Sequence, residues 1–278
     1  MYPHSSHNLA ISLYLPGPTG PITWHATARQ TLYVADGNQA ADGTGAEYDA
    51  RTTVPAWYVI DGVEVRATAA NQAAIVTFGD SITDGTNSTQ DANHRWPDYL
   101  ARKLNARSGN QLSVIDEGIA GNRVLSDTPT YDNALARLDR DVLAQAGVRY
   151  VTLLEGINDI GQTCLGNADA SADGIIAGHR QLISQMHARG LRVFGATLTP
   201  FQGAAYYCED GETKREAVNA WIRTSSEFDG VIDFDAATRD PANPLSYRPD
   251  FDSGDHLHPN DLGYSAMADT IDLNLFSP

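Results

Sequence analysis

Residues Ala73–Gly85 read AAIVTFGDSITDG, and the expected fold follows from this segment. Its first half is a compact apolar run rich in β-branched residues, and Gly79 breaks that run immediately before Asp80 and Ser81. This pattern predicts a buried strand that ends in a tight turn and presents one serine hydroxyl at the strand end. Such a hydroxyl can meet a ligand while the strand fixes its backbone. Alternatively, Ser81 caps the following segment, since serine and aspartate are common at helix N-termini.

Alternating strands and helices are expected from residue 73 onward. Short apolar runs predict strands at residues 73–80, 112–119, 150–154, 192–198 and 231–234. Helical spacing of apolar residues predicts helices at residues 96–107, 133–146, 172–189, 212–226 and 261–274. Strands that alternate with helices form a parallel sheet with helices on both faces, because each crossover must hold a helix. Ligands bind beyond the carboxyl ends of such strands, where Ser81 is expected to lie.

Residues 1–70 differ from this pattern and predict a β-rich appendage to a main domain of residues 71–278. Short β-like runs occur at Leu9–Leu15, Thr31–Ala35 and Trp57–Ile60 without any helical period. A loosely ordered arm wrapped on the main domain is the alternative.

The composition indicates a globular protein with an acidic surface. Of the 278 residues, 42% are hydrophobic and 19% are charged, which is too apolar for disorder. A formal net charge of −16 repels polyanions, so nucleic acid is not expected as a partner. No segment approaches the ~18 apolar residues that a membrane span needs. The first 17 residues lack the basic and long apolar regions of a signal peptide, so they do not themselves indicate secretion.

Two further strand ends carry glycine turns and hydrogen-bond donors. Residues Glu117–Asn122 read EGIAGN after the second strand, and Glu155–Asp159 read EGIND after the third. The carboxyl ends of parallel strands share one edge, so these groups are expected near Ser81. Backbone N–H groups and an asparagine amide that converge on a hydroxyl suit acyl transfer, because the carbonyl oxygen becomes an oxyanion.

A serine nucleophile needs a base, and the segment Asp252–Pro259 offers the best candidates. Asp255 and His258 lie three residues apart on a turn, so the carboxylate can orient the imidazole while its other nitrogen faces Ser81. His256 is the competing base. A metal site of these two histidines and Asp255 is disfavoured, because no second ligand pair at zinc spacing appears.

The other histidines are expected to play no part in catalysis. His179 lies on an apolar helix face, which predicts packing, and His187 lies where it can interact with a helix C-terminal dipole. The remaining four lie in loops or the appendage, and none has an acidic residue at a spacing that would indicate a catalytic pair: His4, His7, His25 and His94. The motifs G-x-S-x-G, H-E-x-x-H, G-x-G-x-x-G and the Walker loop are absent, so neither a metal nor another cofactor is expected.

Four ordered blocks of the chain resemble those of the SGNH, or GDSL, esterases and lipases. They are G-D-S at residues 79–81, the glycine turn with Gly121, G-x-N-D at residues 156–159 and D-x-x-H-P at residues 255–259. The resemblance covers residues 73–278. It implies a three-layer α/β/α sandwich of flavodoxin-like type with a five-stranded parallel sheet.

The resemblance also implies roles for the matching residues. Ser81 is the expected nucleophile, His258 the general base and acid, and Asp255 its orienting partner. The expected oxyanion hole combines the N–H groups of Ser81 and Gly121 with the Asn158 side chain. The departure from the family pattern is His256, at a position where smaller residues are frequent.

A serine esterase for short-chain acyl esters is the expected function. The loop of residues 161–170 and the segment before Asp255 lack a long apolar lid that would shelter a fatty-acyl chain. Similar members of the family act on acetylated plant polysaccharides or on small aryl and alkyl esters, so a small-molecule or carbohydrate ester is the expected partner. The alternatives are a lysophospholipase or thioesterase that uses the same residues, and a non-catalytic carbohydrate-binding module.

Two cysteines and a group of aromatic residues border the predicted site. Cys164 and Cys208 follow the third and fourth strands, which are expected to be neighbours, so a disulfide between them is expected, with two free thiols as the alternative. A disulfide would favour an exported protein. Four aromatic residues either stack on sugar rings or cover the edges of the core: Phe201, Tyr206, Tyr207 and Tyr247.

Overall fold

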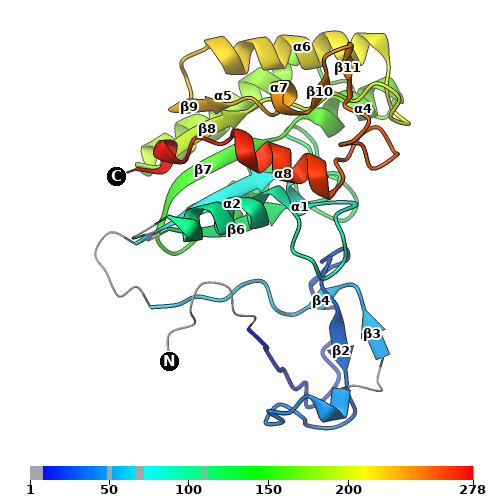
Figure 1. Ribbon diagram of the computed structural model, residues 1–278, viewed down its shortest axis with the longest axis vertical. Helices are drawn as coiled ribbons and strands as arrows, with labels where there is room; N and C mark the ends of the chain where they lie inside the picture. Colours follow the sequence, from blue (N-terminus) through cyan, green and yellow to red (C-terminus); the bar gives the residue numbers. More distant parts are fainter. Residues whose placement is uncertain (1–8, 49–51, 67–71, 108, 110–111, 278) are drawn as a thin grey trace. The chain divides into compact units, whose positions relative to one another are not determined.

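The computed structural model describes residues 9–48, 52–66, 72–107, 109 and 112–277 (Figure 1). The chain separates into two compact units. The first comprises Met1–Glu64 with Gln90–Asn93, and the second comprises Val65–Thr89 with His94–Pro278. The boundary expected between residues 70 and 71 lies outside the described residues.

A five-stranded parallel sheet forms the centre of the second unit, which confirms the predicted fold class. Its strand order is β6-β5-β7-β8-β9. The strands are β5 (Ala73–Gly79), β6 (Leu112–Gly118), β7 (Val148–Leu154), β8 (Arg192–Ala196) and β9 (Gly230–Ile232). Gly79 of β5 is in register with Gly118 of β6 and with Leu154 of β7. The three loops that follow these strands therefore leave the sheet at the same level.

Helices cover both faces of the sheet (Figure 1). On one face α2 (Trp96–Ala106) packs against α8 (Asp261–Thr270), which also contacts α7 (Phe234–Thr238). The second group of packed helices is α3 (Ala134–Leu138), α4 (Ile157–Cys164), α5 (Ala172–Ala188) and α6 (Glu209–Thr224). The expected helices are present, although the one predicted at residues 133–146 is α3 followed by a π-helical turn, η2 (Asp139–Leu143).

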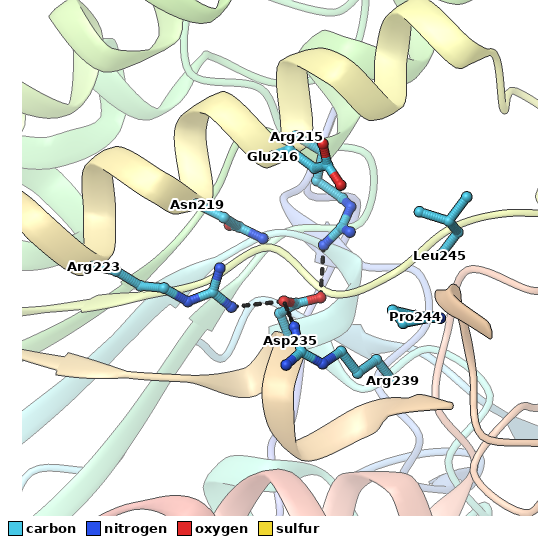
Figure 2. A pocket seen from close by; sticks show the side chains of 8 residues that line it. All are labelled: Arg215, Glu216, Asn219, Arg223, Asp235, Arg239, Pro244 and Leu245. Carbon is cyan, nitrogen blue, oxygen red and sulfur yellow. Dashed lines mark hydrogen bonds and ion pairs between the residues drawn. The ribbon is translucent and has the colours of Figure 1, made fainter. Parts of the chain in front are cut away.

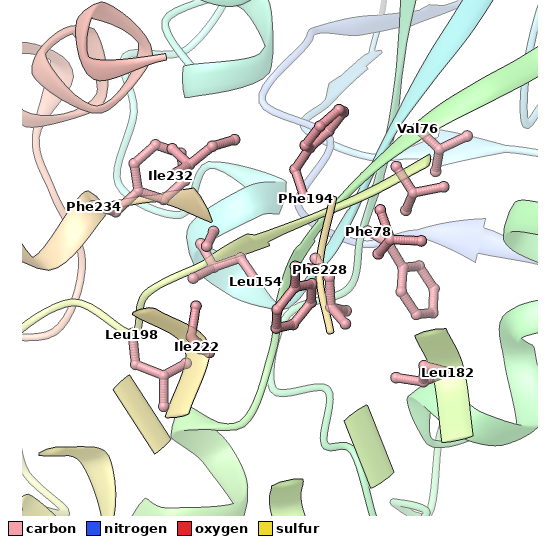
Figure 3. Packing of buried hydrophobic residues seen from close by; sticks show 14 of the residues in the cluster. Val76, Phe78, Leu154, Leu182, Phe194, Leu198, Ile222, Phe228, Ile232 and Phe234 are labelled. Carbon is pink, nitrogen blue, oxygen red and sulfur yellow. The ribbon is translucent and has the colours of Figure 1, made fainter. Parts of the chain in front are cut away.

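The core lies between the sheet and these helices (Figure 3). All seven residues of β5 are buried, as expected for a central strand with helices on both sides. Phe78, Phe194 and Phe234 are fully buried, and each such side chain contributes about 1.5–3 kcal/mol through the apolar surface it removes from water. This packing holds the end of β5, and with it Ser81, in a fixed position.

The ends of several elements differ from the predicted ranges. β9 ends at Ile232, because Asp233 caps α7 by accepting a hydrogen bond from Ala236 N, so Phe234 lies in a helix and not in a strand. α8 ends at Thr270, and a separate 3-10 turn, η3 (Leu273–Phe276), follows it. Among the described residues, four short strands were not predicted. Two of them, β10 (Arg239–Asp240) and β11 (Asn243–Tyr247), form an antiparallel hairpin in the second unit. The other two, at Trp24–His25 and Thr52–Val54, lie in the first unit.

Ion pairs to the buried carboxylate of Asp235 tie α6 to α7. Arg215 donates to one carboxylate oxygen of Asp235 at 2.8 Å, and Arg223 donates to the other at 2.6 Å. Arg239 shares that second oxygen at 3.2 Å (Figure 2). These groups line a cavity of about 220 Å³ that contains none of the expected site residues. Its arginines are satisfied by carboxylates of the protein, so we assign this cluster a structural role.

Cys164 and Cys208 form a disulfide, which confirms the expected pairing. Their Cα atoms lie 5.7 Å apart, and the bond joins the end of α4 to Cys208, the residue that caps the start of α6. No helix among the described residues is both long enough and apolar enough to cross a membrane.

The first unit consists of short antiparallel pairs. β1 (Trp24–His25) pairs with β4 (Trp57–Tyr58), β2 (Leu32–Val34) pairs with β3 (Thr52–Val54), and a 3-10 turn, η1, spans Ala46–Tyr48. The prediction of a strand at Leu9–Leu15 is wrong, because these residues form no strand. Within the described residues the run Leu9–Leu15 has no strand partner, and Leu9 is 67% exposed. Its apolar side chains are therefore not buried in a core, and an unpaired strand is not stable.

Candidate active site

Ser81 is the first residue of a short helix that begins where β5 ends. Asp80 caps this helix, α1 (Ser81–Asp84), because its carboxylate accepts a hydrogen bond from Ile82 N at 2.9 Å. Ser81 is only 6% exposed, and its backbone N–H belongs to the first turn, where the helix offers no acceptor. The alternative that Ser81 caps this helix is therefore wrong: Asp80 provides the cap, and the serine hydroxyl is left for other contacts.

A chain of hydrogen bonds links Ser81 to the loop before α8. The Oγ atom of Ser81 lies 2.9 Å from Nε2 of His258, and Nδ1 of His258 lies 2.7 Å from Oδ2 of Asp255. Ser81 and His258 are 177 residues apart in the sequence. The structure thus brings together the serine, the imidazole and the carboxylate expected from the sequence.

Asp255 is held by more groups than the imidazole alone. Its Oδ1 atom accepts hydrogen bonds from the backbone N–H groups of Leu257 and His258, at 2.9 and 2.8 Å. Burial on its own would raise the pKa of Asp255, but these bonds and the one from His258 Nδ1 outweigh it, and the net shift is downward. Asn87, which the sequence analysis did not single out, also donates to Oδ2 at 2.9 Å. The carboxylate is therefore charged and fixed in orientation.

His256 does not reach Ser81. Its Nδ1 atom binds Asp252 Oδ2 at 2.5 Å, so the loop carries two separate His–Asp pairs. Its backbone φ of +61° lies in the left-handed region, which is uncommon for a residue other than glycine. Because each imidazole binds its own aspartate, His258 contacts Ser81 whereas His256 does not.

The expected oxyanion donors lie on the loops after β6 and β7. Gly121 has a φ of +78°, and a Cβ there would collide with the Tyr131 hydroxyl, so the turn requires glycine. Asn158 is 5% exposed; its amide nitrogen donates to Asn122 O at 2.9 Å, which leaves one amide hydrogen for another acceptor. Within the described part of the chain, the backbone N–H groups of Ser81 and Gly121 have no protein acceptor.

Asp159 fixes the turn beside these donors. Its two carboxylate oxygens accept from the backbone N–H groups of Val124 and Leu125, at 2.8 and 3.0 Å. Burial raises the pKa of Asp159 to about 6, against the lowering effect of these hydrogen bonds. The G-x-N-D block therefore supplies one candidate donor, Asn158, and one residue that holds the neighbouring loop in place.

Arg137 of α3 is fully buried and joins the three strand ends. Its guanidinium donates to the carbonyl oxygens of Gly79 and Glu117, at 2.8 and 2.9 Å, and pairs with the Glu155 carboxylate at 3.3 Å. Gly79 is the last residue of β5, Glu117 is the second-last residue of β6, and Glu155 directly follows β7. One side chain thus holds together the loops that carry Ser81 and the candidate donors.

Two buried carboxyl groups adjoin this arginine. Burial raises the pKa of Asp80 to about 7, although the hydrogen bond from Ile82 N and the charge of His258 oppose this shift. Burial and the neighbouring charge of Asp80 raise the pKa of Glu155 well above its usual range, against the effect of Arg137. Asp80 therefore carries less than its full negative charge near neutral pH.

The remaining described histidines serve other contacts. His179 is fully buried and bonds to Glu155 O at 3.1 Å, and burial lowers its pKa to about 4, in line with the expected packing role. His187 pairs with Asp229 at 2.9 Å. His94, for which no acidic partner was expected, binds Asp261 at 2.7 Å across 167 residues of sequence. His4 and His7 lie outside the described residues.

The aromatic residues near the site pack mainly on one another. Phe201 is fully buried, and its ring lies 6.2 Å from that of Tyr206 and 5.1 Å from that of Tyr207. Tyr247 is 4% exposed. Covering the core edge, the second of the two expected roles, is therefore their main role. Tyr206 has an additional contact, because its hydroxyl donates to Asn158 Oδ1 at 3.2 Å.

The residues that the structure describes include no group of three or more His, Cys, Asp or Glu side chains placed to hold a metal ion. His256 and His258 bind different aspartates through Nδ1 and do not converge on one point with Asp255. Among the described residues, these two His–Asp pairs therefore provide hydrogen bonds and charge but not a set of metal ligands around one point.

Two residues of the site, Asn87 and Arg137, were not predicted from the sequence, and Tyr206 was expected beside the site but not in contact with Asn158. Arg137 offered a local signal, since a charged residue stands in an apolar helical stripe beside Leu138. Asn87 and Tyr206 contact partners that are distant in sequence, and nothing in their immediate neighbourhood indicates those contacts.

The fold and the site define a three-layer α/β protein with a hydrogen-bonded Ser–His–Asp arrangement at the carboxyl edge of its sheet. A model of the GDSL-like lipase/acylhydrolase family matches residues 77–266. The chain belongs to this family and is an enzyme of the carboxylic ester hydrolase class.

Solved structures share this fold at low sequence identity. A carbohydrate acetylesterase family member from Sinorhizobium meliloti is 19% identical, with a TM-score of 0.58 over 72% of this chain and 95% of its own. A GDSL-like lipase from Bacteroides thetaiotaomicron is 18% identical, with a TM-score of 0.57 over 76% and 91%. An inhibitor-bound aryl esterase from M. smegmatis is 18% identical, with a TM-score of 0.53 over 70% and 94%. A search of curated proteins found no match.

Proposed function

We propose that the protein is a serine esterase that hydrolyses short-chain acyl esters, including acetyl groups on carbohydrates, through an acyl-enzyme on Ser81. In this proposal His258 is the general base and acid, and Asp255 orients it. The N–H groups of Ser81 and Gly121 and the Asn158 amide form the oxyanion hole. The observation that carries the proposal is the pair of hydrogen bonds from Ser81 to His258 and from His258 to Asp255, at 2.9 and 2.7 Å.

The proposed reaction has two acyl-transfer steps. Ser81 Oγ attacks the ester carbonyl carbon while Nε2 of His258 takes the hydroxyl proton, and the carbonyl oxygen becomes an oxyanion that the donors stabilise. The C–O bond to the alcohol then breaks, and His258 gives its proton to the leaving alkoxide. Water repeats the sequence on the acyl-enzyme, releases the carboxylic acid and restores Ser81. Asp255 stays ionised throughout and stabilises the imidazolium.

The surroundings of the site support a preference for short acyl groups. The connection from α4 to α5, residues 165–171, contains one large apolar side chain, Leu165, which is 52% exposed. A long acyl chain would need a continuous apolar surface to leave water. The descriptions of the similar folds, a carbohydrate acetylesterase family member and an aryl esterase, fit the same preference.

A series of 4-nitrophenyl esters tests this preference. We expect kcat/KM to be highest for the acetyl or butyryl ester and to fall for octanoyl and dodecanoyl esters, because the leaving group is constant and only the acyl contact changes. A maximum at octanoyl or longer would contradict the proposal and favour a lipase or lysophospholipase.

Replacing Asn158 by alanine tests the oxyanion role. We expect Asn158→Ala to lower kcat about 10²- to 10³-fold with little change in KM, because the amide meets the oxyanion only after attack. Asn167→Ala is the matched control, since Asn167 is exposed on the connection between α4 and α5. A rise in KM with unchanged kcat for Asn158→Ala would assign the amide to substrate binding instead.

We also propose that the protein works outside the cytoplasm. The Cys164–Cys208 disulfide supports this location, because such bonds persist mainly in oxidising compartments.

The net charge of −16 favours an uncharged or cationic ester over a polyanionic partner.

A further inference from the structure

The second His–Asp pair on the loop before α8 has an open hydrogen-bonding position. Asp252 accepts from Nδ1 of His256 through Oδ2 and from its backbone N–H through Oδ1, at 2.5 and 3.1 Å. The His256 side chain is 52% exposed, and no atom in the described part of the chain bonds to its Nε2. A carboxylate on Nδ1 keeps the proton there, so Nε2 is an acceptor that a ligand hydroxyl can use.

This imidazole lines a cavity of about 380 Å³. Other parts of the wall come from the β10–β11 hairpin and the loop after β8, where Asn243 Nδ2 donates to Gln202 Oε1 at 2.6 Å. The lining, all of it within the described residues, contains two carboxylates, Asp240 and Asp252, and neither lysine nor arginine. Its chemistry suits neutral hydroxyl groups and disfavours anions.

Two contacts show that His256 is held in place. Its backbone has the uncommon positive φ noted above, which Asp252 supports through the N–H bond. Gly203 lies against the ring, and a Cβ at that position would be 2.9 Å from two ring carbons. The His256 ring therefore fits against Gly203 because this residue has no side chain.

The cavity is lined in part by the loop that also carries Asp255 and His258, through Asp252 and His256. Tyr247 lines the cavity, and its hydroxyl donates at 3.1 Å to the carbonyl oxygen of Leu257, the residue between His256 and His258. The pKa of Tyr247 is raised mainly by burial, and the charges of Asp80 and Asp255 add to the shift. The hydrogen bond to Leu257 thus connects this wall of the cavity to the loop that carries His258.

We propose that this cavity is the subsite for the alcohol part of the ester and that it takes a neutral, polyhydroxylated alcohol such as a sugar ring. Nε2 of His256 accepts a hydrogen bond from one sugar hydroxyl, and the amides of Gln202 and Asn243 bind others. The carboxylates disfavour an anionic alcohol such as a glycerophosphate headgroup. The inference rests on the proposed esterase function and adds the class of alcohol and the residues that select it.

The test compares two acetyl esters that differ only in their alcohol, O-acetylated xylose and ethyl acetate. We expect His256→Asn, which tolerates the left-handed backbone, to lower the ratio of kcat/KM for the sugar ester to that for ethyl acetate about 3- to 10-fold. Asn243→Ala, on a different wall, is expected to lower the same ratio by a similar factor. His187→Asn is the matched control, because His187 pairs with Asp229 and does not line this cavity. Free xylose is expected to inhibit the wild type more strongly than His256→Asn.

The outcomes separate this inference from the proposed function. A ratio that stays constant in both variants, because the two esters lose activity equally or not at all, would overturn the subsite. Wild-type enzyme that hydrolyses ethyl acetate but no sugar ester would also overturn it and leave the esterase proposal standing. Absence of hydrolysis with both esters and with 4-nitrophenyl acetate would overturn the esterase proposal itself.

Discussion

Ser81→Ala is expected to lower kcat for 4-nitrophenyl acetate about 10⁴- to 10⁶-fold. The variant keeps the donors and the imidazole, but it cannot form the acyl-enzyme on which the proposed mechanism depends. Its unfolding free energy is expected to change by about 1 kcal/mol or less, because the hydroxyl contributes a single bond, to His258. Steady-state kinetics and urea denaturation measure the two quantities.

The double variant Ser81→Ala/His258→Ala sharpens this test. Groups that act as one unit lose activity together, so we expect the double variant to be no less active than Ser81→Ala. A further large fall in the double variant would mean that His258 assists catalysis without Ser81. Undiminished kcat in Ser81→Ala would rule out the nucleophile assigned here.

Arg137→Met is expected to destabilise the protein by about 3–5 kcal/mol in urea denaturation. The guanidinium is fully buried; its removal leaves the Glu155 carboxylate without this cation and takes one hydrogen bond away from each of the carbonyl oxygens of Gly79 and Glu117. Arg140→Met is the matched control: its side chain is 61% exposed and pairs with Asp132 and Asp141, so we expect a loss below about 1 kcal/mol.

The pH dependence of the Arg137→Met loss provides a second readout. Glu155 already has a raised pKa, and without the arginine it rises further. A carboxyl group with a raised pKa in the folded state binds more protons there than in the unfolded state, so stability falls as pH rises. The loss is therefore expected to be smaller at pH 5 than at pH 8. An equal loss at both pH values would mean that Glu155 is not the group left unpaired.

The features predicted well from the sequence are those with local signals. The apolar run of β5 and its break at Gly79 are contiguous, and the three-residue spacing of Asp255 and His258 places both on one turn. The order of strands and helices then determines a parallel sheet, because crossovers between parallel strands follow few allowed paths. The Cys164–Cys208 pairing followed from the same topology.

The features missed depend on contacts between distant residues. His94 and Asp261 lie 167 residues apart, and the three strand ends that Arg137 joins are known only once the sheet is assembled. The strand expected at Leu9–Leu15 had the right pattern but no partner among the described residues. Local patterns specify which face a segment can bury, whereas pairing decides whether it does so.

Labelling by a fluorophosphonate tests whether Ser81 is an activated nucleophile. Such a reagent phosphonylates a serine that a neighbouring base has activated, and peptide mass spectrometry locates the adduct. We expect one adduct per chain, on Ser81, which forms much more slowly in His258→Ala and is absent in Ser81→Ala. Wild-type protein that stays unlabelled, or that carries the adduct on another residue, would contradict this expectation.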